Sequence, residues 1–150
     1  YRDAMGKCGR VLGPEHPNTF ITMINTGGAL QARGKAAEAE RLLDGVEAAA
    51  RKAFTGSNAR WVAKLLTRRG MARTALGKLD AAEKDLLEAH PLLLSTRGEE
   101  HEETRVCVKA LVGLYRVRQG SEPSRGWERE AASCDVQYPR GRTAHRQDQE

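Results

Sequence analysis

The chain has 150 residues, of which 39% are apolar, 30% charged and only 5% aromatic, and its formal net charge is +5. This composition is typical of a globular domain whose core is built from aliphatic and small side chains. It excludes a membrane-spanning helix, because no segment approaches the roughly 18 consecutive apolar residues that one requires, and no signal-peptide pattern is seen. The three cysteines, Cys8, Cys107 and Cys134, form no C-x-x-C pair. This argues against a zinc site or a disulfide framework and favours a cytoplasmic protein.

The sequence repeats itself at an interval of about 43 residues. Gly34, Gly77 and Gly120 are separated by this interval. The first two are each followed by Lys, then by Ala-Glu five and six residues after the glycine, and by Leu nine residues after it. Self-similarity at such a period is the signature of a repeat architecture, in which each unit is one supersecondary motif.

Two further sets of residues follow the repeat. Gly27, Gly70 and Gly113 each precede a turn glycine by seven positions. His16 and His101, in contrast, are 85 residues apart, one fewer than two full intervals. The third unit therefore contains a one-residue shift, and its register is open by one residue.

Each unit is predicted to form two helices. The expected helices are 17–33 and 36–54 in the first unit, 58–76 and 79–96 in the second, and 100–119 in the third. The units are 13–55, 56–97 and a degenerate final repeat or cap at 98–134, while 1–12 ends a preceding repeat and 135–150 is a disordered tail. We expect a whole hairpin to precede Tyr1, and the helical repeat domain to span 1–134.

Local signals support these boundaries. Pro17 suits the first position of a helix, where its missing N–H costs nothing, and Gly34 suits a position after a helix end, where φ is positive. Ser57 or Asn58 is expected to cap the helix that follows it. Pro91 is expected to kink or shorten its helix.

The pattern resembles the tetratricopeptide repeat, in which a small residue is followed by a turn glycine, then Ala-Glu, then Leu. The linker Val-Leu-Gly-Pro-Glu-His-Pro-Asn-Thr at 11–19 and the segment Gly-Glu-Glu-His-Glu-Glu-Thr at 98–104 are similar to the kinesin-light-chain-like subclass, and the resemblance covers residues 1 to about 120. It implies an all-α fold, a right-handed α-solenoid of antiparallel helix hairpins. The first helix of each hairpin would line a concave groove that holds a partner.

No catalytic arrangement is evident in the sequence. His101-Glu102 begins like a zinc-protease motif, but Arg105 stands where the second His would be. His16 and His101 are better explained as hydrogen-bonding residues at helix starts, and Cys107 as a small apolar filler. We expect no enzyme activity, no metal site and no cofactor.

Three residues match a carboxylate clamp of tetratricopeptide co-chaperones. Asn25 lies two positions before Gly27, while Lys64 and Arg68 lie six and two positions before Gly70. Lys64 and Arg68 share one helix face and could both donate to a carboxylate. The alternative interpretations are coincidence or a general basic groove for acidic peptides.

One helical register applied to the three units predicts the groove. The residues just after Gly27 and Gly70 should face it, while both glycines pack against the second helix. Its predicted lining is Ile21, Ile24, Asn25, Gly28 and Gln31 from the first unit, Lys64, Thr67, Arg68 and Met71 from the second, and Lys109, Gly113 and Arg116 from the third. We expect this surface to carry four cations and no carboxylate, with the head groups of Lys64 and Arg68 exposed.

The leading functional hypothesis is a scaffold that binds a protein or peptide, acidic or with a C-terminal carboxylate, in this groove. A second is an accessory domain of a larger signalling enzyme, such as a bacterial serine/threonine kinase. A third is nucleic-acid binding through residues 51–78, a stretch with eight cations and no acid. We expect no membrane partner.

Overall fold

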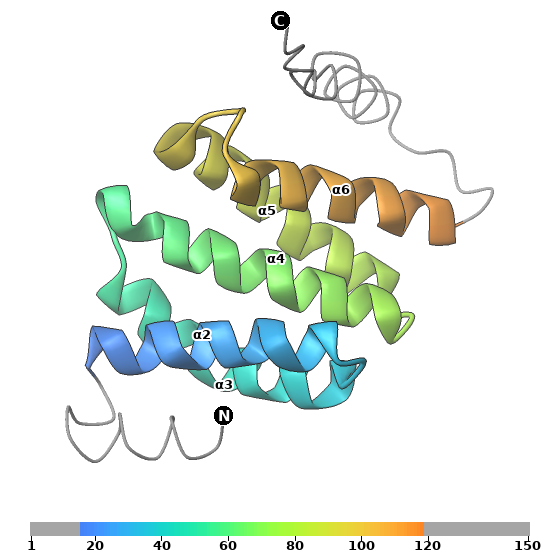
Figure 1. Ribbon diagram of the computed structural model, residues 1–150, viewed down its shortest axis with the longest axis horizontal. Helices are drawn as coiled ribbons and strands as arrows, with labels where there is room; N and C mark the ends of the chain where they lie inside the picture. The colour runs from blue at the N-terminus through green and yellow to red at the C-terminus, as the bar shows by residue number, and fades with distance from the viewer. Residues whose placement is uncertain (1–15, 119–150) are drawn as a thin grey trace, which may run out of the picture.

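The computed structural model describes residues 16–118, and within that range every regular element is helical (Figure 1). The elements are α2 (Pro17–Ala32), α3 (Ala36–Ala53), the 3-10 helix η1 (Gly56–Ala59), α4 (Arg60–Ala75), α5 (Leu79–Arg97) and α6 (Glu102–Val117). The all-α prediction is confirmed for these residues, and each α-helix begins and ends within two residues of its predicted bounds. The segments predicted at 1–12, in the cap after α6 and in the 135–150 tail lie outside the described residues.

The turn glycines end their helices as the repeat predicts. Gly34 has φ of +75° and Gly77 has φ of +74°, a region that favours glycine. The next residue donates back to the helix in both copies, from the Lys35 N–H to Leu30 O and from the Lys78 N–H to Arg73 O, each at 2.9 Å. Two hairpin turns of the same Schellman type therefore join α2 to α3 and α4 to α5.

The two equivalent histidines cap helices, as predicted. His16 Nδ1 accepts from the Asn18 N–H, and His101 Nδ1 accepts from the Glu103 N–H, both at 3.1 Å. Because they are 85 residues apart, this match gives the register of α6 relative to α2. Gly113 is equivalent to Gly28 and not to Gly27.

The predicted cap at Ser57 or Asn58 and the predicted shortening of a helix at Pro91 are both wrong. Neither Ser57 nor Asn58 caps α4, because a 3-10 turn over Gly56–Ala59 leads directly into that helix and no side chain bonds its first N–H groups. Pro91 does not shorten α5, which continues to Arg97. Pro91 is exposed, and the residues that bracket it, His90 and Leu93, are buried and hold the helix in place.

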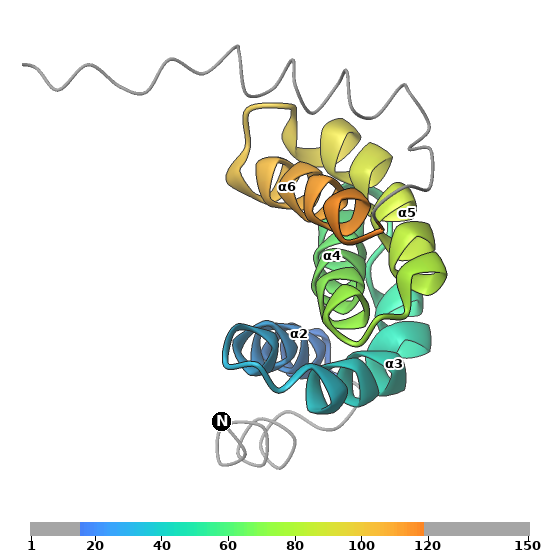
Figure 2. The same ribbon diagram turned by 90° about the vertical axis from the view of Figure 1, so that its right-hand side faces the viewer.

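The helices form two layers. In Figure 2, α2, α4 and α6 lie along the inner side of an arc, and α3 and α5 lie outside them. Contacts run between neighbouring helices within the inner layer and from each hairpin to the next. The inner layer is therefore a continuous surface contributed by three helices from different units.

Small residues set the distance between the layers. A Cβ atom added to Gly27 would lie 2.6 Å from Leu43 Cδ2, and one added to Gly70 would lie 2.7 Å from Leu86 Cγ. Leu43 and Leu86 belong to the second helix of each hairpin and are fully buried. The prediction that both glycines pack against the second helix is confirmed.

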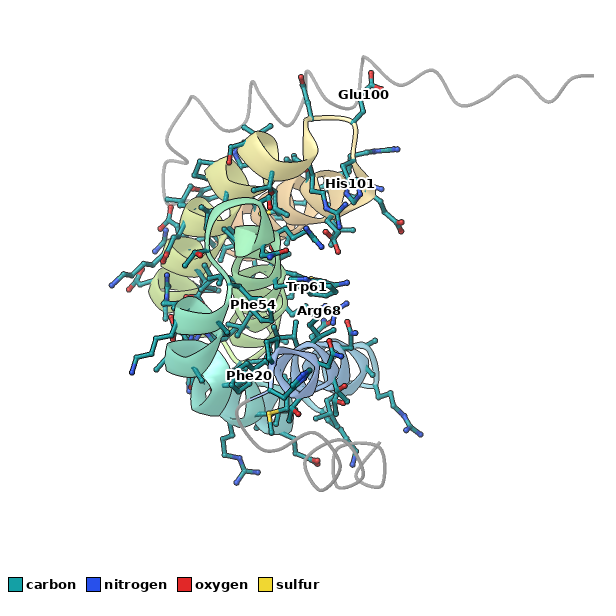
Figure 3. All side chains as sticks on the ribbon, turned by 90° about the vertical axis from the view of Figure 1, so that its left-hand side faces the viewer. Phe20, Phe54, Trp61, Arg68, Glu100 and His101 are labelled. Carbon is teal, nitrogen blue, oxygen red and sulfur yellow. The ribbon has the colours of Figure 1, made fainter. Side chains whose placement is uncertain are left out.

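The main apolar core extends through both layers. It is rich in Leu and Ala, with Ile24, Leu65, Leu66, Leu93 and Leu111 at or near zero exposure. Its aromatic part joins successive units, since the Phe20 and Phe54 rings meet edge to face at 6.4 Å and Trp61 lies 6.3 Å from Phe54 (Figure 3). Trp61 thus packs at the start of α4.

Most of the basic stretch is paired within the protein. Arg69 is 4% exposed and donates twice to Asp85, at 2.9 and 2.8 Å. Its other nitrogen bonds to Asp44 and to Glu47. Because these acids come from α3 and α5, the network joins the inner helix α4 to both helices of the outer layer.

Further cations extend this network. Arg73 bonds to Glu40, Asp44 and Asp85, Lys78 lies 2.6 Å from Glu40, and Arg51 joins Glu47 to Glu88. Five of the eight cations in 51–78 face a carboxylate, namely Arg51, Lys64, Arg69, Arg73 and Lys78. Much of the charge that motivates the nucleic-acid hypothesis is thus paired within the protein, while Lys52, Arg60 and Arg68 form no ion pair with a carboxylate of the described residues.

This network makes stability depend on pH. The Arg69 guanidinium, followed by Arg51, lowers the pKa of Glu47 from its ordinary value of 4.5 to about 2. A carboxyl whose pKa is lower in the folded state stabilises the fold above its unfolded pKa, and this contribution is lost as pH falls through the folded pKa. We expect the free energy of unfolding to fall between pH 4.5 and pH 2, and to fall less steeply in Glu47→Gln. Urea titrations across that range measure the two slopes, and equal slopes would contradict the assigned role.

Candidate binding groove on the inner face

Two hollows lie along the inner face and share Val106, which is 38% exposed. The smaller, here called the ionic hollow, has a volume of about 210 Å³ and lies where α4, α5 and α6 meet. Its lining is Lys64, Thr67, Arg68, Leu93, Glu102, Glu103 and Val106. The larger, here called the apolar hollow, has a volume of about 500 Å³ between α2, α4 and α6 and is lined by Gln31, Met71, Thr74, Ala75, Val106, Lys109, Ala110, Gly113 and Leu114.

Arg68 is the cation with the most unusual surroundings. Its side chain points to the open side of the arc (Figure 3), and its Nη1 donates to Ile24 O at 2.7 Å and to Asn25 Oδ1 at 3.1 Å. Both acceptors are uncharged, and within residues 16–118 no carboxylate hydrogen-bonds to this guanidinium. Burial lowers the pKa of Arg68, and the nearby Glu103 charge offsets part of that effect.

Gly28 of α2 leaves room for the Arg68 guanidinium. A Cβ atom on Gly28 would lie 2.6 Å from Arg68 Cζ, so the guanidinium rests on the bare backbone of α2. Gly28 thus lies beside the groove, as its register predicts. The bonds to α2 hold the charge of Arg68 at the edge of the ionic hollow, where its Nε and Nη2 donate to no oxygen of the described residues.

Lys64 is paired, which contradicts the predicted charge pattern. Its Nζ lies 3.0 Å from Glu103 Oε1 and 5.0 Å from the centre of the Trp61 ring. The prediction of a groove with cations and no carboxylate is therefore wrong, since Glu102 and Glu103 line the same hollow. The prediction of exposed head groups is also wrong, because Lys64 and Arg68 are both half-buried.

The floor of the ionic hollow is buried and neutral. Thr67 is 4% exposed, and its hydroxyl donates to Ala63 O at 2.9 Å. Cys107 lies beneath it, fully buried, and burial raises the pKa of its thiol to about 11. Such a thiol is protonated at neutral pH, which fits the prediction of a packing residue rather than a nucleophile.

The apolar hollow brings predicted residues together from three helices. Gln31 of α2, Met71 of α4 and Lys109 with Gly113 of α6 all line it. Outside the backbone of α6 itself, no atom of residues 16–118 lies within 4 Å of the position that a Cβ on Gly113 would take, so the hollow is open to the described part of the chain at this point. The exposed Lys109 places a positive charge at its rim.

Other predicted residues lie elsewhere. Ile24 is fully buried in the core, because the groove side of α2 begins one position later, at the exposed Asn25. Ile21 is half-buried and packs against the core cluster. Arg116 is exposed but lines neither hollow.

The sequence predicts no acid in the groove, and a pairing of Lys64 or Arg68 with Glu102 or Glu103 is the result that would contradict ligand binding by these two cations together. Lys64 does pair with Glu103, so that form of the hypothesis is wrong, and of these two cations only Arg68 has no acidic hydrogen-bond partner among the described residues. Glu103 also lies in the first turn of α6, where negative charge is favourable. Its second role follows from the side-by-side packing of α4 and α6, which brings residues 39 positions apart into contact. The repeat interval indicates such contacts, because residues about one interval apart lie on neighbouring inner helices. Arg68, for example, contacts Asn25, which lies 43 positions earlier.

The described residues contain no group of three or more His, Cys, Asp or Glu placed to hold a metal ion, and none of their helices is long and apolar enough to cross a membrane. No model of a known protein family matches the chain, and the search of curated proteins finds no match.

Proposed function

We propose that the inner face is a binding groove for a peptide segment of another protein, within a right-handed α-solenoid of the tetratricopeptide type. The ligand would place an acidic side chain in the ionic hollow and an apolar side chain in the apolar hollow. The repeat pattern and the side-by-side packing of α2, α4 and α6 support the architecture. The two adjoining hollows support the ligand chemistry.

Arg68 is the observation that carries the proposal. A half-buried guanidinium that meets only neutral acceptors has lost part of its hydration without gaining an ion pair. A carboxylate that reaches its Nε and Nη2 would supply charge-assisted hydrogen bonds in a partly desolvated place, where they are stronger than on an open surface. The site therefore favours an anionic group at this point.

The apolar hollow would take a second side chain of the ligand, close to the acidic one. Its volume is in the range of pockets that hold small ligands or anchoring side chains. Met71, Val106 and Ala110 supply apolar contacts, and Met71 can adapt its shape to the guest. A Leu or Met side chain that fills this hollow would supply the apolar part of the affinity.

A side-chain carboxylate suits the ionic hollow better than a chain end. Glu103, itself a side-chain carboxylate, already reaches Lys64 there. The hollow is also walled by Leu93 and Thr67, which leave a recess that a side chain can enter from the open side. Affinity measurements on the amidated and the free-acid form of one peptide distinguish a side-chain carboxylate from a C-terminal carboxylate.

The test uses a panel of labelled ten-residue peptides with capped ends, each with one Glu and one Leu at a different spacing and Gly or Ser elsewhere. Fluorescence anisotropy should find a spacing that binds and whose Glu-to-Gln form binds more weakly. Arg68→Gln should weaken the best peptide about tenfold, because one charged hydrogen bond supplies roughly 1.5–3 kcal/mol before screening.

Lys52→Gln is the matched control, since Lys52 is an exposed cation of the outer helix α3 and lines neither hollow. It should change the affinity by less than twofold. Equal losses in the two variants would show a non-specific charge effect, and no binding by any peptide of the panel would show that the proposed function is wrong.

A further inference from the structure

We propose that Glu103 is an internal competitor for the ligand, and that its carboxylate occupies at Lys64 the place that an incoming carboxylate would take. This inference rests on the proposed function. It identifies a specificity residue, because affinity for an acidic ligand would then be set by the exchange of one carboxylate for another and not by two free cations.

The Glu103 carboxylate is held by one close contact and one long one. Its Oε1 lies 3.0 Å from Lys64 Nζ, while its Oε2 lies 3.6 Å from Arg97 Nε. Oε2 is covered from solvent and accepts no hydrogen bond from the described residues. A covered carboxylate oxygen without a donor is costly, so this carboxylate is incompletely satisfied where it stands.

Asp85 is an example of a carboxylate in this fold whose two oxygens are both hydrogen-bonded. Both Asp85 oxygens accept hydrogen bonds from Arg69, at 2.8 and 2.9 Å, and Arg73 donates a third at 2.8 Å. Glu103 has one close contact and one long one. Of the two carboxylates, Glu103 is therefore the one that an external anion can displace at low cost.

The Glu103 side chain has a second basic partner, Arg97, within reach. It is the second residue of α6, so its backbone is fixed by the His101 cap while its side chain lies in the first turn. When the side chain leaves Lys64, Arg97 remains within reach, and the amino end of the helix continues to favour its charge. Displacement thus costs Glu103 one ion pair and not its whole environment.

The ionic hollow is lined by two cations and two carboxylates. Lys64 and Arg68 face Glu102 and Glu103, so the hollow is balanced when empty. An incoming carboxylate adds a third negative charge unless one moves away. With Glu103 turned toward Arg97, the ligand can bridge Lys64 and Arg68, and Lys64 keeps its position over the Trp61 ring.

The experiment compares Glu103→Gln with Glu102→Gln, using the best-binding Glu/Leu peptide of the panel. Both substitutions remove one negative charge from the same hollow and the same helix turn, but only Glu103 is paired with Lys64. Glu103→Gln should strengthen binding about five- to tenfold, and Glu102→Gln less than twofold. The melting temperature of each variant shows that the fold is retained.

The results that would contradict the competitor role differ from those that would contradict the proposed function. If wild type binds the peptide and Glu103→Gln binds it equally or more weakly, the competitor role is wrong and the groove remains. If the two Gln variants gain equally, the gain comes from net charge, and the competitor role is again wrong. If neither wild type nor Glu103→Gln binds any peptide of the panel, the proposed function itself is wrong.

Discussion

Asp85→Asn is expected to lower the free energy of unfolding by about 3–5 kcal/mol, because it leaves the buried Arg69 guanidinium without its main partner. Arg69 and Asp85 side chains are each only 5% exposed, so water cannot replace the lost charge. The remaining acids, Asp44 and Glu47, approach a different nitrogen of Arg69 and cannot occupy the vacated place. Urea unfolding followed by circular dichroism measures the loss.

Glu88→Gln is the control for this experiment. Glu88 lies on the same helix and pairs with Arg51, but both side chains are about 40% exposed, and such pairs supply about 1 kcal/mol or less. The double variant Arg69→Met with Asp85→Leu should recover part of the stability, since an apolar pair no longer buries an uncompensated charge. A loss in Asp85→Asn no larger than that in Glu88→Gln would contradict the buried network.

Gly70→Leu is expected to destabilise the protein by roughly 1–3 kcal/mol through overpacking. An added Cβ would lie 2.7 Å from Leu86 Cγ and 3.3 Å from the backbone oxygen of Ala82, so α4 and α5 would have to move apart. Because Leu86 is fully buried and packed within the core, its side chain cannot move away from the added atoms. Thermal unfolding measures the effect.

Gly45→Ala is the matched control. Gly45 lies inside α3 with no atom within 4 Å of an added Cβ, so Ala should stabilise that helix by up to about 1 kcal/mol. The opposite signs of the two substitutions separate close packing from helix propensity. If Gly70→Leu melts at the wild-type temperature, the inter-helix contact is not as close as the structure shows.

Much of the fold could be predicted because its signals are local or periodic. Gly34 and Gly77 require a positive φ, and His16 and His101 precede equivalent helices. The glycines at 27 and 70 repeat because each unit needs the same close contact with its second helix. Such constraints act within one hairpin, so they can be found from the spacing alone.

The charge pattern could not be predicted in this way. No acid lies between Arg51 and Lys78 in the sequence, yet Arg69 is surrounded by acids 16 to 25 positions away. Helical periodicity indicates which face a residue occupies, but it does not show which rotamer brings Lys64 to Glu103. Seven predicted positions therefore line one of the two hollows, Gln31, Met71, Lys109 and Gly113 in the apolar hollow and Lys64, Thr67 and Arg68 in the ionic hollow, but the predicted charge pattern is wrong.

The most direct test of the proposed groove is an NMR titration of the ¹⁵N-labelled protein with the best-binding Glu/Leu peptide. We expect the largest shifts at the amides of Val106, Lys109 and Gly113 and at the Arg68 Nε–H, all on the inner face between α4 and α6. Shifts concentrated on the outer helices α3 and α5, or an unchanged spectrum at saturating peptide, would contradict a binding site on the inner face.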